Sequence, residues 1–487
     1  MKKLLFGLSC SSLIFIASCK TDDPEVLSEN EVVEEVAEFA VDLGNSAVPY
    51  VVITTDVAIK NEPKVSAFMR IYQSDELIQK QTIGIEYRGS TSFRLSDKKS
   101  FGIETWDDSG NDVSVPFFDF PEEEDWILNG HVVNLTDGWA FDPTLMYHQF
   151  GYELFRKMGN YAARTKFLEL EINGEYQGVY VFMEKLKRDK ERIDIKKLEA
   201  ADVDTEAITG GYIIKIDKTS GGDLNLKQPL DYFLNNWDDD ARYTEEISWR
   251  SEYDINGELI TFEPEYNAPY HSNMYLETYF LYEYPKSQDI TSAQKRYIQD
   301  YIHDFETALL NDDFSSGNRT YTDYIDLNSF VDFFLINEVT RNVDGYRLST
   351  YMSKDRGEKL KMGPIWDLNI GFSSGDRVPL DGWVMNYNQY VESDAWLIPF
   401  WWPRLLEDPI FQDALKSRWN DLRANTLSTA SLHSMVDASA GYLIENGAID
   451  RNYTKWNIGV DYNARISDMK SFLEQRTQWI DGEIAGF

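Results

Sequence analysis

Two aspartates stand out because of the stretches in which they lie. Asp344 lies in a polar stretch that directly follows a strongly apolar helical pattern at 327–339. Asp367 follows a tryptophan in the stretch GPIWDLN at 363–369, about one hairpin further along the chain. Phosphoryl transfer needs one carboxylate that orients the attacking hydroxyl and other oxygen ligands that hold Mg²⁺. The pair therefore indicates a phosphoryl-transfer site, although a chain with 83 acidic residues also produces such pairs by chance.

Other catalytic patterns find little support. The five histidines are scattered and none shows HExxH spacing, while the glycine-rich Walker pattern GxxxxGK[ST] does not occur. Ser90 and Ser92 lack the context of a nucleophile elbow, which argues against a hydrolase triad. Cys10 and Cys19 are the two cysteines, too few for a zinc cluster or a disulfide framework.

Composition and charge narrow the class of ligand. Hydrophobic residues make up 43% of the chain, which is typical of a globular protein with a sizeable core. The formal net charge is −36, and so acidic a surface repels nucleic-acid backbones. We therefore expect no nucleic-acid partner, and we expect ATP to need a locally basic pocket or bound cations.

The N-terminus has the features of an export signal. A short basic start is followed by an apolar stretch that is too short to span a bilayer, so residues 1–18 are read as a signal peptide. IASC at 16–19 resembles a bacterial lipobox, in which Cys19 would be lipidated; the alternative is a plain signal peptide with an incidental cysteine. Residues 19–47 are acidic and are expected to be a tether. We thus expect a cell-envelope protein that is lipid-anchored to a membrane, at the outer membrane or the cell surface.

The elements that must position the two aspartates change in character along the chain. Alternating β-branched and aromatic stretches predict strands in the first half, and Asn173-Gly174 between two of them predicts a hairpin. Apolar residues at helical spacing predict helices in the second half. The expected strands are 50–54, 66–72, 81–88, 99–104, 167–172, 176–183 and 211–217, and the expected helices are 145–158, 293–310, 327–339, 413–424, 432–445 and 463–484. This order predicts an α+β fold with a β-rich N-terminal lobe at 48–184 and a helix-rich C-terminal lobe at 185–487.

Two stretches have more than one interpretation. Residues 225–292 are polar and rich in tyrosine, tryptophan and aspartate, so they are either an insertion that shapes a binding cleft or an ordinary surface excursion. The aromatic run 396–402 is either a platform for sugar rings or part of the core.

Several motifs follow one another in a fixed order. They are RGSTS at 88–92, KKS at 98–100, DWIL at 125–128, LM at 145–146, INGEYQGVY at 172–180, EK at 184–185, GGYII at 210–214 with Asp217, Asp344, WDLN at 366–369 and the stretch 404–418. In combination they resemble the spore-coat protein H (CotH) kinase family, over about residues 48–487. The resemblance implies an atypical protein-kinase-like fold with two lobes and ATP-dependent phosphoryl transfer.

The resemblance also implies roles for the acidic and amide side chains. Asp344 stands at the family's catalytic aspartate, and Asp367 would ligate Mg²⁺ or Mn²⁺ with Asn369 and Ser349 assisting. Ser349 replaces the usual asparagine and Asn369 replaces the second acid of the WDxD motif, so the metal site is expected to be weaker. These departures leave open an active kinase, a one-metal kinase or a pseudokinase.

The nucleotide-binding cations follow from the same motifs. If 99–104 is a strand, only one of Lys98 and Lys99 can enter the cleft, and we expect Lys99 to contact the phosphates. Arg88 either adds positive charge or braces the turn at Gly89. Glu184 either pairs with the phosphate-binding lysine, lies at the hinge near adenine, or is a surface charge beside Lys185.

The sequence thus favours an extracytoplasmic kinase that transfers the ATP γ-phosphate to Ser or Thr of exported proteins. The alternative is a surface-anchored pseudokinase, or a binding or assembly module without turnover, with glycans as one candidate ligand. A surface glycan hydrolase with paired carboxylates is a third reading, for which no pair stands out.

Overall fold

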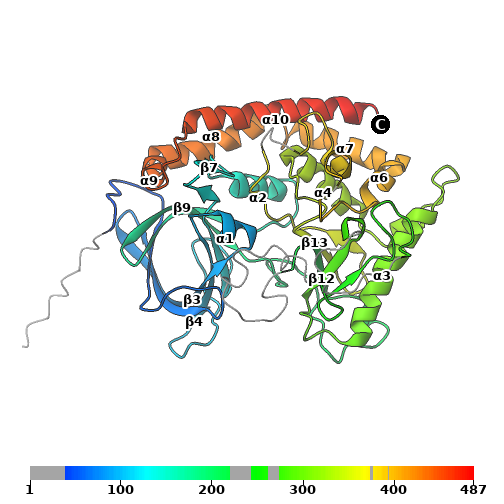
Figure 1. Ribbon diagram of the computed structural model, residues 1–487, viewed down its shortest axis with the longest axis horizontal. Helices are drawn as coiled ribbons and strands as arrows, with labels where there is room; N and C mark the ends of the chain where they lie inside the picture. The colour runs from blue at the N-terminus through cyan, green and yellow to red at the C-terminus, as the bar shows by residue number, and fades with distance from the viewer. Residues whose placement is uncertain (1–38, 220–242, 262–273, 373–376, 393) are drawn as a thin grey trace, which may run out of the picture. The chain divides into compact units, whose positions relative to one another are not determined.

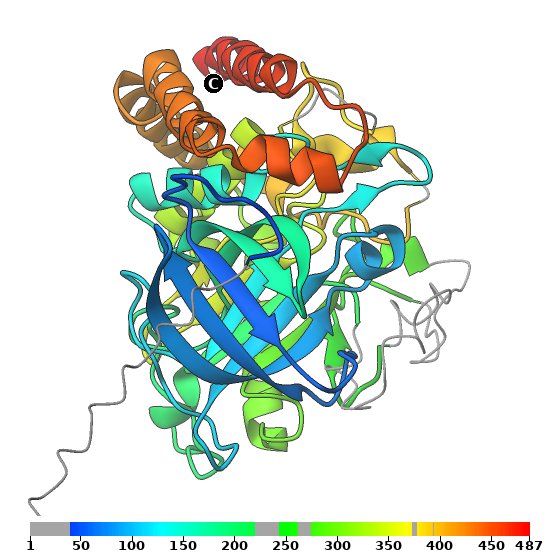
Figure 2. The same ribbon diagram turned by 90° about the vertical axis from the view of Figure 1, so that its left-hand side faces the viewer.

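Seven strands of the first half close into a barrel. The computed structural model describes residues 39–219, 243–261, 274–372, 377–392 and 394–487. The barrel order is β1-β2-β3-β4-β5-β9-β8, and the parallel pairing of β1 with β8 closes it. Figures 1 and 2 show the barrel at the blue, N-terminal side of the fold. Its strands are β1 (Tyr50–Thr54), β2 (Val65–Gln73), β3 (Glu76–Arg88), β4 (Ser100–Trp106), β5 (Asp125–Asn129), β8 (Thr165–Ile172) and β9 (Glu175–Glu184). Alternation along these strands turns apolar side chains inward, so the barrel has a hydrophobic core of its own.

The predicted hairpin at Asn173-Gly174 is confirmed. Both residues have positive φ, 50° and 79°, as the tight turns that suit the twist of two antiparallel strands require. The turn joins β8 to β9, which pair from Ile172 and Glu175 onward with a register shift between Leu170 and Glu171.

A second sheet lies beside the barrel. Its order is β11-β12-β10-β13-β14, with β10 (Tyr212–Ile216), β11 (Ser248–Arg250), β12 (Tyr279–Tyr284), β13 (Thr350–Lys354) and β14 (Leu360–Met362). β11 and β12 fall inside the range 225–292, and Phe280 and Leu281 are fully buried. The described part of this range is therefore built into the sheet and is not a surface excursion; residues 225–242 and 262–273 lie outside the description.

Helices cover the rest of the fold. They are α1 (Thr91–Leu95), α2 (Tyr147–Lys157), α3 (Ser292–Asn311), α4 (Leu327–Thr340), α5 (Tyr387–Tyr390), α6 (Trp401–Leu406), α7 (Pro409–Ala424), α8 (Thr429–Glu445), α9 (Ala448–Lys455) and α10 (Tyr462–Ala485), with short strands β6 (Val133–Asn134) and β7 (Trp139–Ala140). Local signals set several helix ends: Thr291 and Gln294 form a capping box on α3, and Asp408 caps α7 before Pro409. Among the described residues, no helix is both long and apolar enough to cross a membrane. The α+β class is confirmed.

The expected division at residue 184 does not follow the packing. α2 lies within the first range, yet it packs on α4 and α8 of the second range as well as on β8, and its apolar side chains share one core with residues of both ranges. α9 lies in the second range but packs on β9 of the barrel. Residues 39–487 accordingly form one compact unit.

The expected tether ends earlier than the sequence suggested. The signal peptide, Cys19 and residues 20–38 lie outside the described residues. From Phe39 onward the chain packs on the barrel: the Phe39 ring centroid is 4.9 Å from that of Tyr50, and the Ala40 amide donates to Glu171 Oε2 at 2.8 Å. Leu43 is also buried there, so the last nine residues of the predicted tether belong to the folded part.

Candidate active site

A cleft of about 640 Å³ is lined by residues of the barrel and residues of the second sheet and its loops. The barrel and α2 contribute Arg88, Asn129, His131, Asp142, His148 and Met183, among others. The second sheet and its loops contribute Lys215, Asp217, Asp344, Ser349, Asp367, Asn369, Arg377 and Trp396. The structure therefore brings both aspartates, Ser349, Asn369 and Arg88 to one place.

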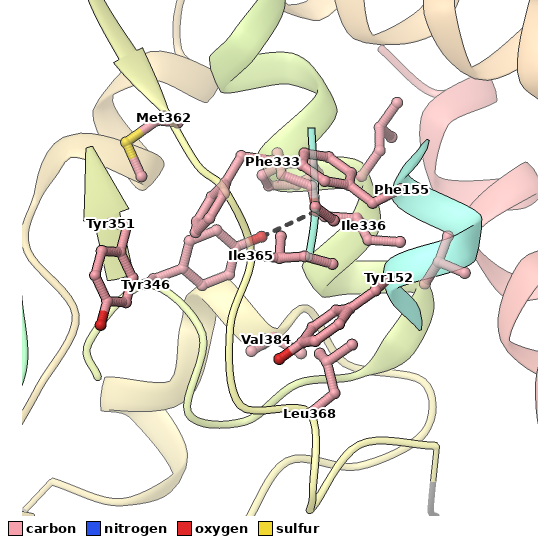
Figure 3. Close-up of a cluster of buried hydrophobic side chains, with 14 of the residues drawn as sticks. Tyr152, Phe155, Phe333, Ile336, Tyr346, Tyr351, Met362, Ile365, Leu368 and Val384 are labelled. Atoms are coloured by element: carbon pink, nitrogen blue, oxygen red, sulfur yellow. Dashed lines mark hydrogen bonds between the residues drawn. The ribbon is translucent and has the colours of Figure 1, made fainter. Parts of the chain in front are cut away.

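Two loops on either side of a hairpin carry the aspartates. α4 ends at Thr340 and is capped by Arg341, which takes a left-handed conformation, and Asp344 follows in the connection to β13. β13 pairs antiparallel with β14, and Asp367 follows β14. Figure 3 shows how these loops are anchored: Ile365 and Leu368 lie among Tyr152 and Phe155 of α2 and side chains of α4. The expected hairpin between the two acids is thus present.

Asp344 is held by arginines. Its Oδ1 lies 2.5 Å from Arg347 Nη2 and 3.6 Å from Arg377 Nη1. Arg347 is buried and also donates to the carbonyl oxygens of Val343 and Trp396, which fixes it in place. The Asp344 side chain remains 23% exposed, so one carboxylate is oriented by a rigid cation and still accessible from the cleft.

Asp367 is held through its backbone and faces the cleft. Its φ of 53° is unusual for a residue with a side chain, and its amide donates to the Tyr152 hydroxyl at 3.2 Å. Its Oδ1 lies 3.6 Å from His148 Nε2, and the other ring nitrogen of His148 lies 3.0 Å from Asn129 Nδ2. With 42% of the side chain exposed, the carboxylate is open to a ligand.

The donor set suits a hard divalent cation. Asp344, Asp367, Asn369 and Ser349 all line the cleft and all offer oxygen atoms, which Mg²⁺ and Mn²⁺ prefer. In chemical type, these four side chains fit such an ion.

Arg88 lines the cleft beside an aromatic stack. Its guanidinium lies 5.5 Å from the centroid of the Trp366 ring, and this ring stacks on Tyr152 at 5.8 Å. Arg88 is thus held close to the loop that carries Asp367 while it faces the cleft.

Lys99 is not among the residues that line the described cleft. Its Nζ donates to the carbonyl oxygens of Phe93 and Ser96 at 2.9 and 2.6 Å, at the end of α1. Lys98 is buried, and its Nζ donates to Val179 O at 2.5 Å and to Asn452 Oδ1 at 2.9 Å. Because β4 begins only at Ser100, strand alternation does not apply to either lysine, and the choice of Lys99 on that ground was wrong.

Glu184 also lies away from the described cleft lining. It is fully buried, and its carboxylate accepts from Arg164 Nη1 at 2.7 Å, from the Arg164 amide at 2.8 Å and from the Tyr161 hydroxyl at 3.1 Å. It is therefore neither a surface charge nor, in this arrangement, the partner of a phosphate-binding lysine; it braces the end of β9.

The aromatic run 396–402 belongs to the core. Trp401 and Trp402 are 0% and 1% exposed, so they cannot stack on sugars, while Trp396 is partly exposed and lines the cleft. The glycan-platform interpretation of the run is contradicted for these two rings.

A second group of carboxylates is formed by Glu123, Glu124 and Asp125. Among the described residues, it is the one group of three or more His, Cys, Asp or Glu side chains whose ligand atoms lie close enough together to share a metal ion. Lys187 Nζ already lies 2.6, 2.6 and 3.0 Å from their oxygens. A cation of the protein itself thus neutralises this group, which is not part of the cleft lining.

Several residues of the cleft lining belong to no sequence pattern that would have identified them as site residues. His131, Asp142, His148 and Asn129 come from segments far from the Asp344 loop, and their approach depends on the barrel meeting α2. Lys215 lies on β10 and Asp217 directly follows its last residue, so this spacing of two could have placed both side chains on the cleft side once β10 was assigned.

One comparison with known proteins decides the family. The model of the family described as CotH kinase protein matches residues 85–480. The chain belongs to the CotH kinase family. The match spans most of the chain and includes both aspartate loops, β3 from Ile85 onward and α2, so CotH family membership applies to the part that builds the cleft. Among curated proteins, none matches the chain significantly. Membership of the CotH kinase family supports a kinase-like function and hence a transferase.

Proposed function

We propose that this chain is an extracytoplasmic CotH-like kinase that transfers the γ-phosphate of ATP to Ser or Thr of exported proteins, with Mg²⁺ or Mn²⁺ as cofactor. The observation that carries the proposal is the meeting of Asp344 and Asp367, from two loops on either side of a hairpin, in one cleft of a CotH-family chain. We further propose that the barrel and the helix-rich part correspond to the two lobes of a kinase-like fold.

Each cleft residue then has a role. Asp344 accepts the proton of the acceptor hydroxyl as its oxygen bonds to the γ-phosphorus; the bond from that phosphorus to the bridging oxygen breaks, and ADP leaves. Asp367, Asn369 and Ser349 would hold the divalent ion, which neutralises phosphate charge when bound. Arg88 and Lys215, both in the cleft lining, supply positive charge for the remaining phosphate oxygens.

The proposed place of action comes from the N-terminus. The basic start, the apolar stretch and Cys19 at the end of IASC support export followed by lipid anchoring in the cell envelope. Partners in that compartment would be exported proteins, and the strongly negative chain does not favour nucleic acids.

A second candidate is a pseudokinase that binds nucleotide without turnover. It is favoured by the two arginines that already lie against the Asp344 carboxylate, where an acceptor hydroxyl would have to bind, and by the neutral Asn369 in place of an acid. Both candidates bind nucleotide, so transfer is the measurement that separates them.

The test is phosphoryl transfer by the purified full chain from labelled ATP, with Mg²⁺ or Mn²⁺, to itself or to casein. We expect Asp344→Asn and Asp367→Asn each to lower the rate by about 10²- to 10⁴-fold. Asp437→Asn is the matched control, because Asp437 pairs with Lys470 on the exposed side of α8. Nucleotide binding without transfer by the wild type would support the pseudokinase, and no binding at all would contradict both candidates.

A further inference from the structure

His131 is an unusual side chain in the cleft wall. It follows β5, is 3% exposed, and has a φ of 59°, a conformation that costs energy for a residue with a side chain. No contact to a polar group is found for its Nε2 among the residues that the structure describes, while its Nδ1 faces Asp142. Buried polar atoms are nearly always paired, so a buried Nε2 without a partner, on a residue in the wall of a cleft, needs an explanation.

Asp142 fixes the way in which His131 presents its ring. Asp142 Oδ2 lies 3.4 Å from His131 Nδ1, and the carboxylate is 1% exposed. It also accepts from the Thr144 amide at 2.9 Å, the Thr144 hydroxyl at 2.6 Å and the Tyr147 amide at 2.8 Å. Burial alone would raise the Asp142 pKa, but these donors and His131 outweigh it and lower the pKa. An ionised carboxylate at Nδ1 favours the tautomer with its proton there, which leaves the lone pair on Nε2.

The charge state of the His131 ring determines whether its Nε2 can act as a base or only as a hydrogen-bond acceptor. Burial lowers the pKa of His131 to about 4, and the positive charges of Lys98 and His148 add to this effect. Such a ring is neutral at pH 7 and too weak a base to take the proton of an alcohol efficiently. It is, however, a hydrogen-bond acceptor that has been removed from water.

We propose that His131, held by Asp142, forms a subsite that accepts a hydrogen bond from a hydroxyl or amino group of the nucleoside part of the nucleotide. This inference rests on the proposed function. Phosphate oxygens offer no donor at neutral pH, so they cannot satisfy Nε2, whereas ribose hydroxyls and the 6-amino group of adenine can. Val132, Phe141 and Met183 also line the cleft and provide apolar surface of the kind that a base or sugar needs.

The test combines changes in the ligand with changes in the protein. Affinities for ATP, 2′-deoxyATP, 3′-deoxyATP and purine riboside triphosphate, which lacks the 6-amino group, are measured by calorimetry on the purified full chain. We expect the analogue that lacks the bonded donor to bind the wild type about 3- to 10-fold more weakly than ATP. His131→Asn keeps a side chain that tolerates positive φ but shortens it, and we expect this variant to bind ATP and that analogue equally well.

Two further variants keep the result decisive. Asp142→Asn is measured as well, because an amide donor at Nδ1 would move the proton to Nε2 and remove the same discrimination. His433→Asn, on α8 outside the described cleft lining, should discriminate as the wild type does. Equal discrimination in the wild type, His131→Asn and Asp142→Asn would overturn the subsite and assign Nε2 to a buried water. If nucleotide binds and transfer occurs, that outcome leaves the kinase proposal standing; if no nucleotide binds the wild type, both proposals fail.

Discussion

The barrel and the loops between residues 341 and 377 differ in where their residues with positive φ lie. At the tight hairpin turns of the barrel, β2–β3 and β8–β9, residues of this kind with side chains are exposed: Ser74, Asp75 and Asn173. In the loops they include buried residues, namely Arg341, Tyr346 and Phe372, and the cleft residues Ser349, Asp367 and Arg377. A hairpin turn is set by its own sequence, whereas a buried strained loop persists only where its surroundings hold it.

The surroundings of the aspartate loops centre on one buried ion pair. Arg476 of α10 lies 2.9 Å from Glu338 Oε2 on α4, and both side chains are 0% exposed. Glu338 also accepts from the amides of Val384 and Met385, at 2.7 and 3.0 Å. The ion pair thus connects α4, the helix before Asp344, to α10. The two amide contacts of Glu338 connect α4 to the segment after Arg377, and together these contacts hold the strained loops in place.

The largest effect should come from breaking this pair. We expect Arg476→Met to lower the free energy of unfolding by about 3–5 kcal/mol, because Glu338 would be left as an unpaired buried charge. Denaturant unfolding measures this, and Lys470→Met is the control, since the exposed Lys470–Asp437 pair should contribute about 0–1 kcal/mol. Equal losses in the two variants would contradict the central role of Glu338.

A buried acid in the helix-rich part should make stability depend on pH. Burial raises the pKa of Glu306 to about 8, although Ser251 and Trp401 donate hydrogen bonds to it. Because the pKa in the unfolded chain is about 4.3, its contribution to stability is present below that value and is lost as pH rises through about 8. We expect Glu306→Gln to match the wild type at pH 4 and to be about 2–4 kcal/mol more stable at pH 9. Melting temperatures across this range check it, and a pH-independent difference would contradict it.

The seam between the barrel and α9 offers a smaller effect. A Cβ on Gly178 would lie 2.5 Å from Asn452 Oδ1 and 2.9 Å from Trp456 Nε1, and φ there is 95°. We expect Gly178→Ala to cost about 2–4 kcal/mol, since overpacking adds to the strain of the backbone. Gly174→Ala is the control: φ is 79° but nothing lies within 4 Å, so only the backbone term of about 1–2 kcal/mol remains. Similar unfolding curves for the two variants would show that Asn452 and Trp456 leave room for a Cβ on β9, and would contradict this prediction.

The smallest effect concerns the lysine that the sequence favoured. We expect Lys99→Met to leave nucleotide affinity unchanged, because Lys99 caps carbonyl oxygens of α1 and does not line the described cleft. Arg88→Met, in the cleft lining, should weaken binding about tenfold or more, as loss of a charge-assisted hydrogen bond does. A titration that showed the reverse order would restore Lys99 as the phosphate contact.

These differences show how far sequence patterns reach. The barrel hairpin and the main helices were predictable because turn chemistry and apolar periodicity act over a few residues. The two aspartates were found because they follow recognisable elements. His131 with Asp142, and Lys98 with Asn452, were not predictable because each pair meets only after distant segments pack. The prediction that Lys99 rather than Lys98 enters the cleft was wrong for a local reason. It assumed a strand from residue 99, but the strand begins one residue later.

The contact between Lys98 and Asn452 has a consequence for how the protein is made. Asn452 Oδ1 accepts from Lys98 Nζ and from the Val179 amide, and it comes 354 residues after the lysine. Until the C-terminal helices have been added and have docked, the lysine lacks this acceptor and has only the Val179 carbonyl oxygen. A chain that stops before α9 would therefore leave both the lysine and the Val179 amide without Asn452, and the seam along β9 would stay open.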